Sequence, residues 1–241
     1  MWSGSEWTSS SSAGPDNAPA SASIVARSRP SEKFGTDSST LTTVRALKTY
    51  YDRRAFEYDD WWLGRGRFAD RERPGWDDEV DVLAELISSL RPARTLDVAC
   101  GTGFLTRHLP GDVVGLDQSE RMLSVAREQA PDARFVHGDA LELPFADGEF
   151  DRVFTSYFYC HLEADERARF LSEARRVAGE LVVVASIPGA DDPLERYEER
   201  ILNDGSRWKV LKRVFTGDQL AAELGNGEVL HEGRWFVVVR A

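Results

Sequence analysis

Short apolar runs alternate with amphipathic stretches through the middle of this 241-residue chain. Between the runs, apolar spacing typical of helices covers residues 104–109, 119–130 and 164–178, with Ser119 placed as an N-cap. The runs are short enough to be buried strands, and they cover residues 95–99, 113–116, 134–137, 152–156 and 181–187. This alternation predicts an α/β fold, in which a parallel sheet carries helices on both faces.

Further elements are predicted on either side of this pattern. Two helices precede the first strand, at 41–62 and 76–90, with a Gly-, Arg- and Pro-rich break between them. A charged segment without a predicted element follows Pro188, and then comes a helix near 216–224. Two closing strands are joined by a short link, which predicts an antiparallel hairpin at the sheet edge; they cover 228–231 and 235–240.

The first 40 residues differ from the rest of the chain. They are rich in Ser and have no apolar periodicity that offsets the entropy of ordering them. We therefore expect a flexible tail at 1–40 and one folded domain at 41–241, in which residues 41–92 form a helical cap.

Composition narrows the functional classes. Because 41 acidic residues outnumber 30 basic ones, the net charge of -11 disfavours a nucleic-acid partner. We expect a cytoplasmic protein without a membrane partner, since no apolar run reaches the roughly 20 residues of a membrane helix and no signal peptide is evident. Cys100 and Cys160 are too few for a disulfide framework or a paired zinc motif. Asp191 and Asp192 are interpreted as an acidic loop, and no metal is predicted.

The segment from Thr95 to Gly103 runs from a strand into a glycine-containing turn and then into a predicted helix. Gly101 and Gly103 allow a ligand to approach the backbone, and the helix start offers unpaired N–H groups. Asp97 lies four residues before Gly101, where a carboxylate repels a pyrophosphate but attracts an ammonium group. We therefore expect a ligand that is locally cationic.

Two more carboxylates follow the next predicted strands. Asp117 comes directly after the run at 113–116, where it suits hydrogen bonds to two ribose hydroxyls. Asp139 follows the run at 134–137, where it suits the amino group of an adenine. Asp97 and Asp139 also fit the alternative of turn residues or helix caps. Acids at three consecutive strand ends together indicate a nucleoside site.

These motifs resemble, in order, those of class I S-adenosylmethionine (SAM)-dependent methyltransferases. The motifs are DVACGTG at 97–103, VGLD at 114–117 with SERML at 119–123, GDA at 138–140 with LPF at 143–145, and FDRV at 150–153. Within that superfamily the chain most resembles the small-molecule group that includes the ubiquinone and menaquinone biosynthesis enzymes. The resemblance covers residues 50–187 strongly and the closing hairpin loosely. It implies a Rossmann-like, seven-stranded, mostly parallel sheet with a reversed final strand, and SAM as cofactor.

The resemblance also implies roles for individual residues. Asp97 is expected near the methionyl end of SAM, the glycine turn beneath it and Asp117 on the ribose. Met122 is expected either against the adenine ring or in the helix core. The full set of implied cofactor-binding residues is Tyr51, Tyr58, Asp97, Ala99, Gly101, Gly103, Asp117, Gln118, Met122, Asp139 and Ala140.

Residues 50–59 resemble the opening of this methyltransferase group, where a helix closes over the cofactor. Tyr51 and Tyr58 are expected either near the sulfonium or the methionyl carboxylate, or packed in the core. For Arg53 and Arg54, exposure on a charged helix is favoured over a pair with that carboxylate.

Candidate catalytic residues follow the fourth predicted strand, at the sheet edge where open α/β sheets bind ligands. His161 has an ordinary pKa near neutrality, which suits a base or a group that orients the acceptor; helix capping and core packing are its alternatives. Tyr157, the second catalytic candidate, shapes an aromatic acceptor pocket with Tyr159 or packs in the core. A Trp-rich stretch predicts either a mobile cover over this site or a loop anchored by buried indoles: Trp61, Trp62 and Trp76.

These observations predict SAM-dependent methyl transfer to a small organic acceptor by in-line displacement. A base is optional, because the methyl donor is already activated. A non-catalytic SAM-binding module is the alternative, and Asp97 together with the missing third glycine, replaced by Thr106, disfavours a nicotinamide dehydrogenase. Oxygen, nitrogen and carbon acceptors stay open, as does the oligomeric state.

Overall fold

The computed structural model of the protein describes residues 44–189 and 192–241. The predicted tail at 1–40, the start of the first predicted helix and Asp191 lie outside the described residues. In the described part, no helix is both long enough and apolar enough to span a membrane.

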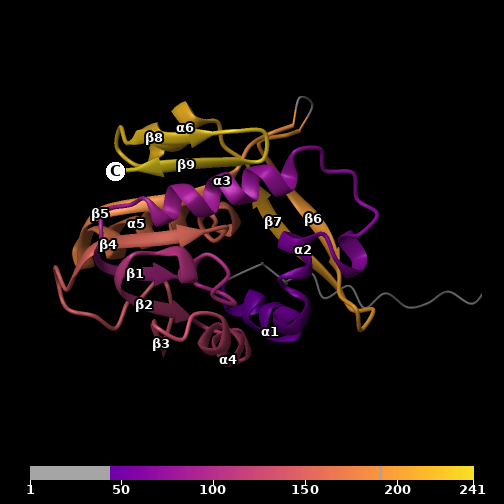
Figure 1. The fold of residues 1–241 in the computed structure, drawn as a ribbon, viewed down its shortest axis with the longest axis horizontal. Coiled ribbons are helices and arrows are strands. Elements are labelled where there is room, and N and C mark those ends of the chain that lie inside the picture. Colours follow the sequence, from indigo (N-terminus) through magenta and orange to yellow (C-terminus); the bar gives the residue numbers. More distant parts are fainter. Residues whose placement is uncertain (1–43, 190–191) are drawn as a thin grey trace, which may run out of the picture. The chain divides into compact units, whose positions relative to one another are not determined.

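Seven strands of the described chain form one sheet in the order β3-β2-β1-β4-β5-β9-β8 (Figure 1). The first five run parallel, and β9 is antiparallel to both of its neighbours, β5 and β8. The prediction of a mostly parallel sheet with one reversed strand and a closing hairpin is therefore confirmed. The strands are β1 (Ala93–Val98), β2 (Gly111–Asp117), β3 (Arg134–His137), β4 (Phe150–Ser156), β5 (Ala178–Ser186), β8 (Glu228–Glu232) and β9 (Phe236–Arg240).

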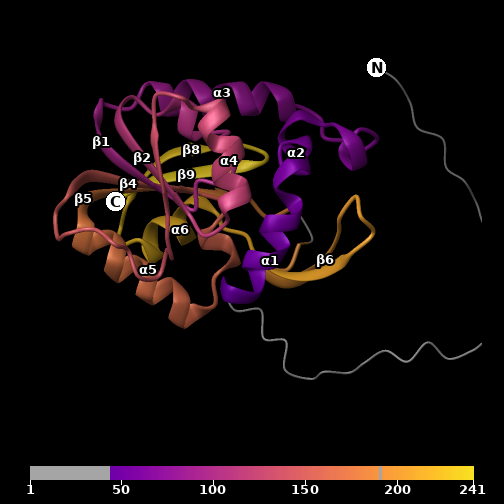
Figure 2. The same cartoon turned by 90° about the horizontal axis from the view of Figure 1, so that it is seen from below.

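Helices cover both faces of this sheet. Figure 2 shows α3 and α4 on one face and α5 and α6 on the other. The apolar residues of the central strands are fully buried between these layers, as the continuous apolar runs predict. Ser119 caps α4 as predicted, because its Oγ accepts the backbone N–H of Met122 at 3.2 Å. The helices are α3 (Trp76–Ser88), α4 (Glu120–Gln129), α5 (Ala164–Val177) and α6 (Gly217–Glu223).

The helix predicted at 104–109 is wrong in extent. Only the 3-10 turn η3 (Thr106–His108) forms there. Pro110 follows directly and disfavours helical dihedrals at the residue before it, so Leu109 is extended. Between the glycine turn and this proline, too few residues remain to nucleate an α-helix.

The helix predicted at 41–62 is interrupted. It divides into α1 (Val44–Arg54), the 3-10 turn η1 (Ala55–Glu57) and α2 (Asp60–Leu63), and the 3-10 turn η2 (Gly66–Phe68) follows. Two carboxylates fasten these pieces beside the glycine turn and α4. Asp52 accepts a hydrogen bond from the Ser119 hydroxyl at 2.6 Å, and Asp59 accepts one from the Thr102 hydroxyl at 2.6 Å. The cap is thereby held over the carboxyl ends of β1 and β2.

A hairpin forms where the sequence predicts no element. Strands β6 (Glu195–Ile201) and β7 (Arg207–Arg213) pair antiparallel as a separate two-stranded sheet, with Arg196 opposite Lys212. Charged residues occupy both faces of β6, so the alternation of apolar and polar positions that predicts strands is missing. In Figure 2 this hairpin lies beside α1, and Tyr50 of α1 shares a buried apolar cluster with Val210 of β7.

Candidate functional site

A turn with three left-handed residues connects β1 to η3. Ala99, Gly101 and Gly103 have φ values of 59°, 56° and 78°. At Gly103 a Cβ atom would lie only 3.2 Å from Ala126 of α4, so the glycine lets the turn pack closely on that helix. Ala99 carries a side chain in the same region of backbone dihedrals, which costs on the order of 1 kcal/mol or more.

Asp117 holds this turn to the end of β2. Its Oδ2 accepts the N–H of Gly101 at 3.0 Å, and its Oδ1 accepts the N–H of Ser119 at 2.8 Å. Burial raises its pKa to about 6, although the two N–H donors oppose that shift. Because each carboxylate oxygen has two lone pairs, both oxygens keep capacity to accept a further hydrogen bond.

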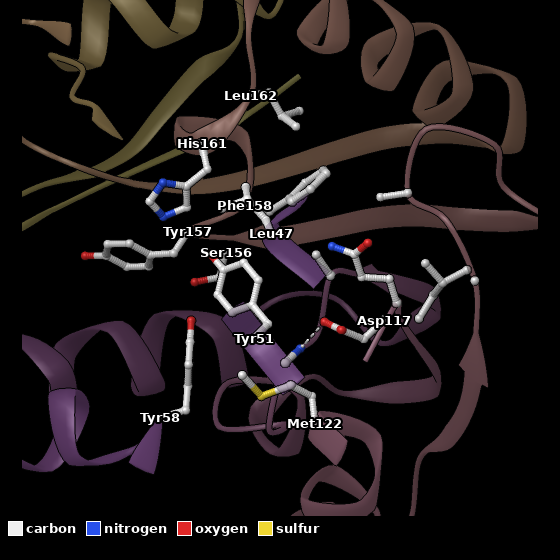
Figure 3. A pocket seen from close by; sticks show the side chains of 16 residues that line it. Leu47, Tyr51, Tyr58, Asp117, Met122, Ser156, Tyr157, Phe158, His161 and Leu162 are labelled. Atoms are coloured by element: carbon white, nitrogen blue, oxygen red, sulfur yellow. Dashed lines mark hydrogen bonds between the residues drawn. The ribbon is translucent and has the colours of Figure 1, made fainter. Parts of the chain in front are cut away.

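A cavity opens at the carboxyl ends of β1, β2 and β4, next to this carboxylate (Figure 3). Its volume is about 40 Å³, below the roughly 300–1,000 Å³ of ligand pockets in general. Leu47 and Tyr51 of α1 form one wall, so outward movement of α1 enlarges it. The lining residues are Leu47, Tyr51, Tyr58, Ala99, Gly101, Leu116, Asp117, Gln118, Met122, Gly138, Ala140, Ser156, Tyr157, Phe158, His161 and Leu162.

Most of the predicted site residues line this cavity, but three cofactor candidates do not. Asp97 is buried beside it, accepts a hydrogen bond from the Thr106 hydroxyl at 2.6 Å and has a pKa that burial raises to about 7. Gly103 packs against α4, as described above. Asp139 is exposed and accepts the N–H of Leu141 at 2.9 Å, as in the turn alternative.

The expectation that Arg54 is exposed is wrong. The residue is 9% exposed, and its guanidinium donates to the Tyr50 hydroxyl at 2.8 Å and lies 4.6 Å from the centre of the Tyr58 ring. Tyrosine rings and a hydroxyl of the folded cap thus surround Arg54, whereas the sequence pattern predicts it on an exposed, charged helix face. Arg53 is exposed as expected, and it pairs with Asp204 at 3.3 Å.

His161 lines the cavity from the 3-10 turn η4 (Tyr159–His161). Burial lowers its pKa to about 3, and the positive charge of Lys212 acts in the same direction. The ring is therefore neutral at pH 7. Its Nδ1 bonds to the carbonyl of Leu211, which makes Nδ1 the donor and leaves Nε2 with a lone pair. Nε2 can accept a hydrogen bond but binds a proton weakly.

A second cavity of about 140 Å³ adjoins the first. Tyr51, Tyr58, Tyr157 and His161 line both cavities, so these side chains stand between them. The wall farther from Asp117 comes largely from the β6–β7 hairpin and the loops at 71–76 and 186–192.

Comparison with known proteins agrees with this architecture. Residues 96–181 match the family model described as a methyltransferase domain. The demethylmenaquinone methyltransferase of Thermotoga maritima is 36% identical over 114 residues, which cover 44% of this chain and 49% of that protein. The demethylmenaquinone methyltransferase of Thermus thermophilus is 40% identical over 109 residues, covering 40% of this chain and 49% of that protein. Over residues 96–181 the chain is therefore similar to methyltransferases.

The alignments span about half the length of these relatives. A solved structure described as a DhpI-SAM-HEP complex superposes with a TM-score of 0.64, covers 82% of this chain and 96% of the other, and is 23% identical. At this identity the likeness shows the fold. It therefore supports the sheet order and leaves the chemistry of the site to its own residues.

Aromatic side chains pack together next to the two cavities. Trp62 stacks on Phe104 with ring centres 4.8 Å apart, and Trp76 donates its indole N–H to the carbonyl of Trp62 at 2.8 Å. Both indoles are buried, which favours an anchored loop over a mobile cover. Tyr157 has a φ of 55° and lies 4.8 Å from Trp61 between ring centres, so this cluster fixes its position.

Sequence reasoning missed the basic side chains of the second cavity. Arg196, Arg200 and Lys212 come from the hairpin that the pattern did not predict. The sequence offered no apolar signal for them, because the alternation of half-buried residues at 196, 198 and 200 with exposed residues between them is visible only in the structure.

Proposed function

We propose that this methyltransferase transfers a methyl group from SAM to a small organic acceptor. Asp117 carries the proposal: a buried carboxylate beside a glycine turn, with free acceptor capacity, at the mouth of an otherwise mostly apolar cavity. Such a group suits two ribose hydroxyls better than a phosphate, which it repels. The methyltransferase domain match and the names of the relatives support the same activity.

The residues present fit this cofactor. Asp117 would hold the ribose. Gln118 from the turn after β2, Met122 from α4 and Ala140 from the loop after β3 would surround the adenine. Tyr51 and Tyr58 would close over the methionyl arm, since they descend from the cap into the cavity (Figure 3). Because the cavity is small, we expect α1 to move outward when the cofactor enters.

SAM supplies a methyl group that is already activated for displacement. The chain's own residues orient the acceptor and exclude water. His161 offers the neutral Nε2 as a hydrogen-bond acceptor at the boundary of the two cavities, and Tyr157 supplies an aromatic wall. Because the pKa of His161 is about 3, this residue orients an acceptor better than it removes a proton. An acceptor that ionises by itself near neutral pH matches such a site.

Two further features concern partner and location. The net charge of -11 supports a small molecule over a nucleic acid as acceptor. Both cysteines, Cys100 and Cys160, are free thiols, which supports a reducing compartment such as the cytoplasm.

Calorimetric titration with SAM tests the proposed function. Asp117→Ala is expected to weaken binding about tenfold or more, the scale of a lost charge-assisted hydrogen-bond pair. Asp112→Ala is the matched control, because Asp112 lies exposed at the opposite end of β2. Equal affinity of the wild type and Asp117→Ala would refute the assigned role.

Transfer is measured separately with methyl-labelled SAM and a cell metabolite extract. Label in a product above the enzyme-free control supports catalysis. Firm SAM binding with no labelled product from any extract would favour the non-catalytic module instead.

A further inference from the structure

The second cavity concentrates positive charge in a protein of net charge -11. Two acidic side chains line it, Asp192 and Glu198, and six basic ones face them. The basic residues are Arg54, Arg71, Arg73, Arg196, Arg200 and Lys212. The positive charge of this cavity is opposite in sign to the net charge of the chain. The average composition of the protein surface therefore does not account for it.

The two acids are already engaged. Glu198 forms ion pairs with Arg196, at 2.7 Å, and with Arg200, and Asp192 lies 3.7 Å from Arg196. These ion pairs stay within the β6 strand and the loop before it. The charge of Glu198 also acts on Lys212, but Glu198 forms its ion pairs with the hairpin arginines.

Lys212 is the most informative of these. It is 7% exposed, its Nζ donates to the Ser186 hydroxyl and lies 5.0 Å from the centre of the Tyr157 ring. Among residues 44–189 and 192–241, no carboxylate forms an ion pair with Lys212 or with the buried Arg54. Burial lowers the pKa of Lys212. A buried cation without an ion-pair partner is costly, and a bound anion relieves that cost.

The positive charges of Lys212 and Arg54 act on His161, which lines the first cavity. The positive charges of Lys212 and Arg54 both lower the pKa of His161, after the larger effect of burial. They therefore lie near the boundary between the two cavities and on the acceptor side of it. The aromatic rings of Tyr58 and Tyr157 separate them from the Asp117 carboxylate.

We propose that the methyl acceptor is a small organic anion whose carboxylate, phosphonate or phosphate group binds Lys212 and Arg54. This inference rests on the proposed function and names its substrate class. The anionic group occupies the second cavity, and the rest of the acceptor extends past His161 and Tyr157 toward the first. A charge-assisted contact to two buried cations selects an anion over a neutral molecule of the same shape.

Three compounds that share a 4-hydroxyphenyl ring test whether the acceptor must be an anion. They are 4-hydroxybenzoate, 4-hydroxyphenylphosphonate and the neutral 4-hydroxybenzamide, each titrated into the full chain saturated with S-adenosylhomocysteine. At least one anion is expected to bind about tenfold more tightly than the amide. The better of the two anions distinguishes a carboxylate site from a phosphonate or phosphate site. Wild-type protein that prefers the amide to both anions overturns the proposal.

Substitutions on β7 test whether Lys212 provides the preference for an anion. Lys212→Met is expected to reduce the preference for the anion to about threefold or less, and Lys212→Arg to restore it. Lys209→Met is the matched control, since Lys209 lies exposed on the same strand, outside both cavities. A thermal melt of each variant reports whether it is folded. A preference that persists in folded Lys212→Met contradicts the assignment.

Titration with S-adenosylhomocysteine distinguishes a failure of the proposed function from a failure of the anionic acceptor. If the wild type does not bind S-adenosylhomocysteine, the proposed function fails before the charge of the acceptor is tested. If Lys212→Met lowers cofactor affinity about tenfold, Lys212 belongs to the methionyl carboxylate, and the anionic acceptor is overturned while the proposed function stands.

Discussion

Replacing Asp97 with Asn tests whether the buried carboxyl at the end of β1 is protonated near neutral pH. Asp97 is 2% exposed, and the described structure gives it one polar side-chain partner, the Thr106 hydroxyl at 2.6 Å. Burial raises its pKa from 3.8 to about 7, and the nearby Asp117 carboxylate acts in the same direction. Asparagine keeps a carbonyl oxygen for Thr106 but has no proton to lose.

The magnitude follows from this pKa. Below pH 3.8 the carboxyl is protonated in both the folded and the unfolded chain, so it has no effect on stability there. As the pH rises toward about 7, the unfolded chain loses the proton first, which favours unfolding. A shift of about three units costs about 4 kcal/mol in full, and about 2 to 3 kcal/mol of that develops between pH 5 and pH 8.

Urea unfolding of the cofactor-free protein at pH 5, 6, 7 and 8 measures this effect. The stability of Asp97→Asn relative to the wild type is expected to rise by about 2 to 3 kcal/mol over the series. Asp132→Asn is the matched control, because it makes the same substitution at an exposed carboxylate. A difference between Asp97→Asn and the wild type that does not change with pH would refute the reasoning.

Two other predictions concern stability and turnover. Glu79 of α3 accepts three successive backbone N–H groups at 234–236, so Glu79→Gln is expected to lower the free energy of unfolding by about 1–3 kcal/mol; an unchanged urea midpoint contradicts this. His161→Ala is expected to lower kcat by removing an orienting contact, and the wild-type pH profile of kcat is expected to show no His161 inflection between pH 5 and pH 8, because burial holds its pKa at about 3. An inflection near pH 6.5 that disappears in His161→Ala would show that the ring titrates as an ordinary histidine.

Much of the fold could be predicted because its signals are local. The strands β4 and β5 each contain a short apolar run, and those runs are buried in the core. Ser119 caps α4 through a contact that spans three residues. The glycine turn and Asp117 are equally local, since strand ends of a parallel sheet meet at one edge.

Tertiary structure decided which candidates reach the cavity. Asp97 resembles Asp117 in its place near a strand end, yet it pairs with Gly115, two residues before Asp117. Its carboxylate therefore lies deeper in the sheet, where it meets Thr106 instead of the cavity. Asp139 has the spacing of an adenine contact, but its carboxylate closes a turn at Leu141. The sequence predicted the position of each acid near a strand end, and the packing of neighbouring elements determined where its side chain points.

The second cavity, with its basic residues, could not be predicted from the sequence and is formed only by the tertiary structure. Burial of Arg54 depends on Tyr50 and Tyr58 folding around it, and burial of Lys212 depends on a hairpin whose strands alternate in charge instead of hydrophobicity. By itself, the sequence determined most of the sheet and the position of the glycine turn, because apolar runs and strand-end motifs act over a few residues. The basic residues of the second cavity come from segments more than a hundred residues apart, and only the folded chain brings them together.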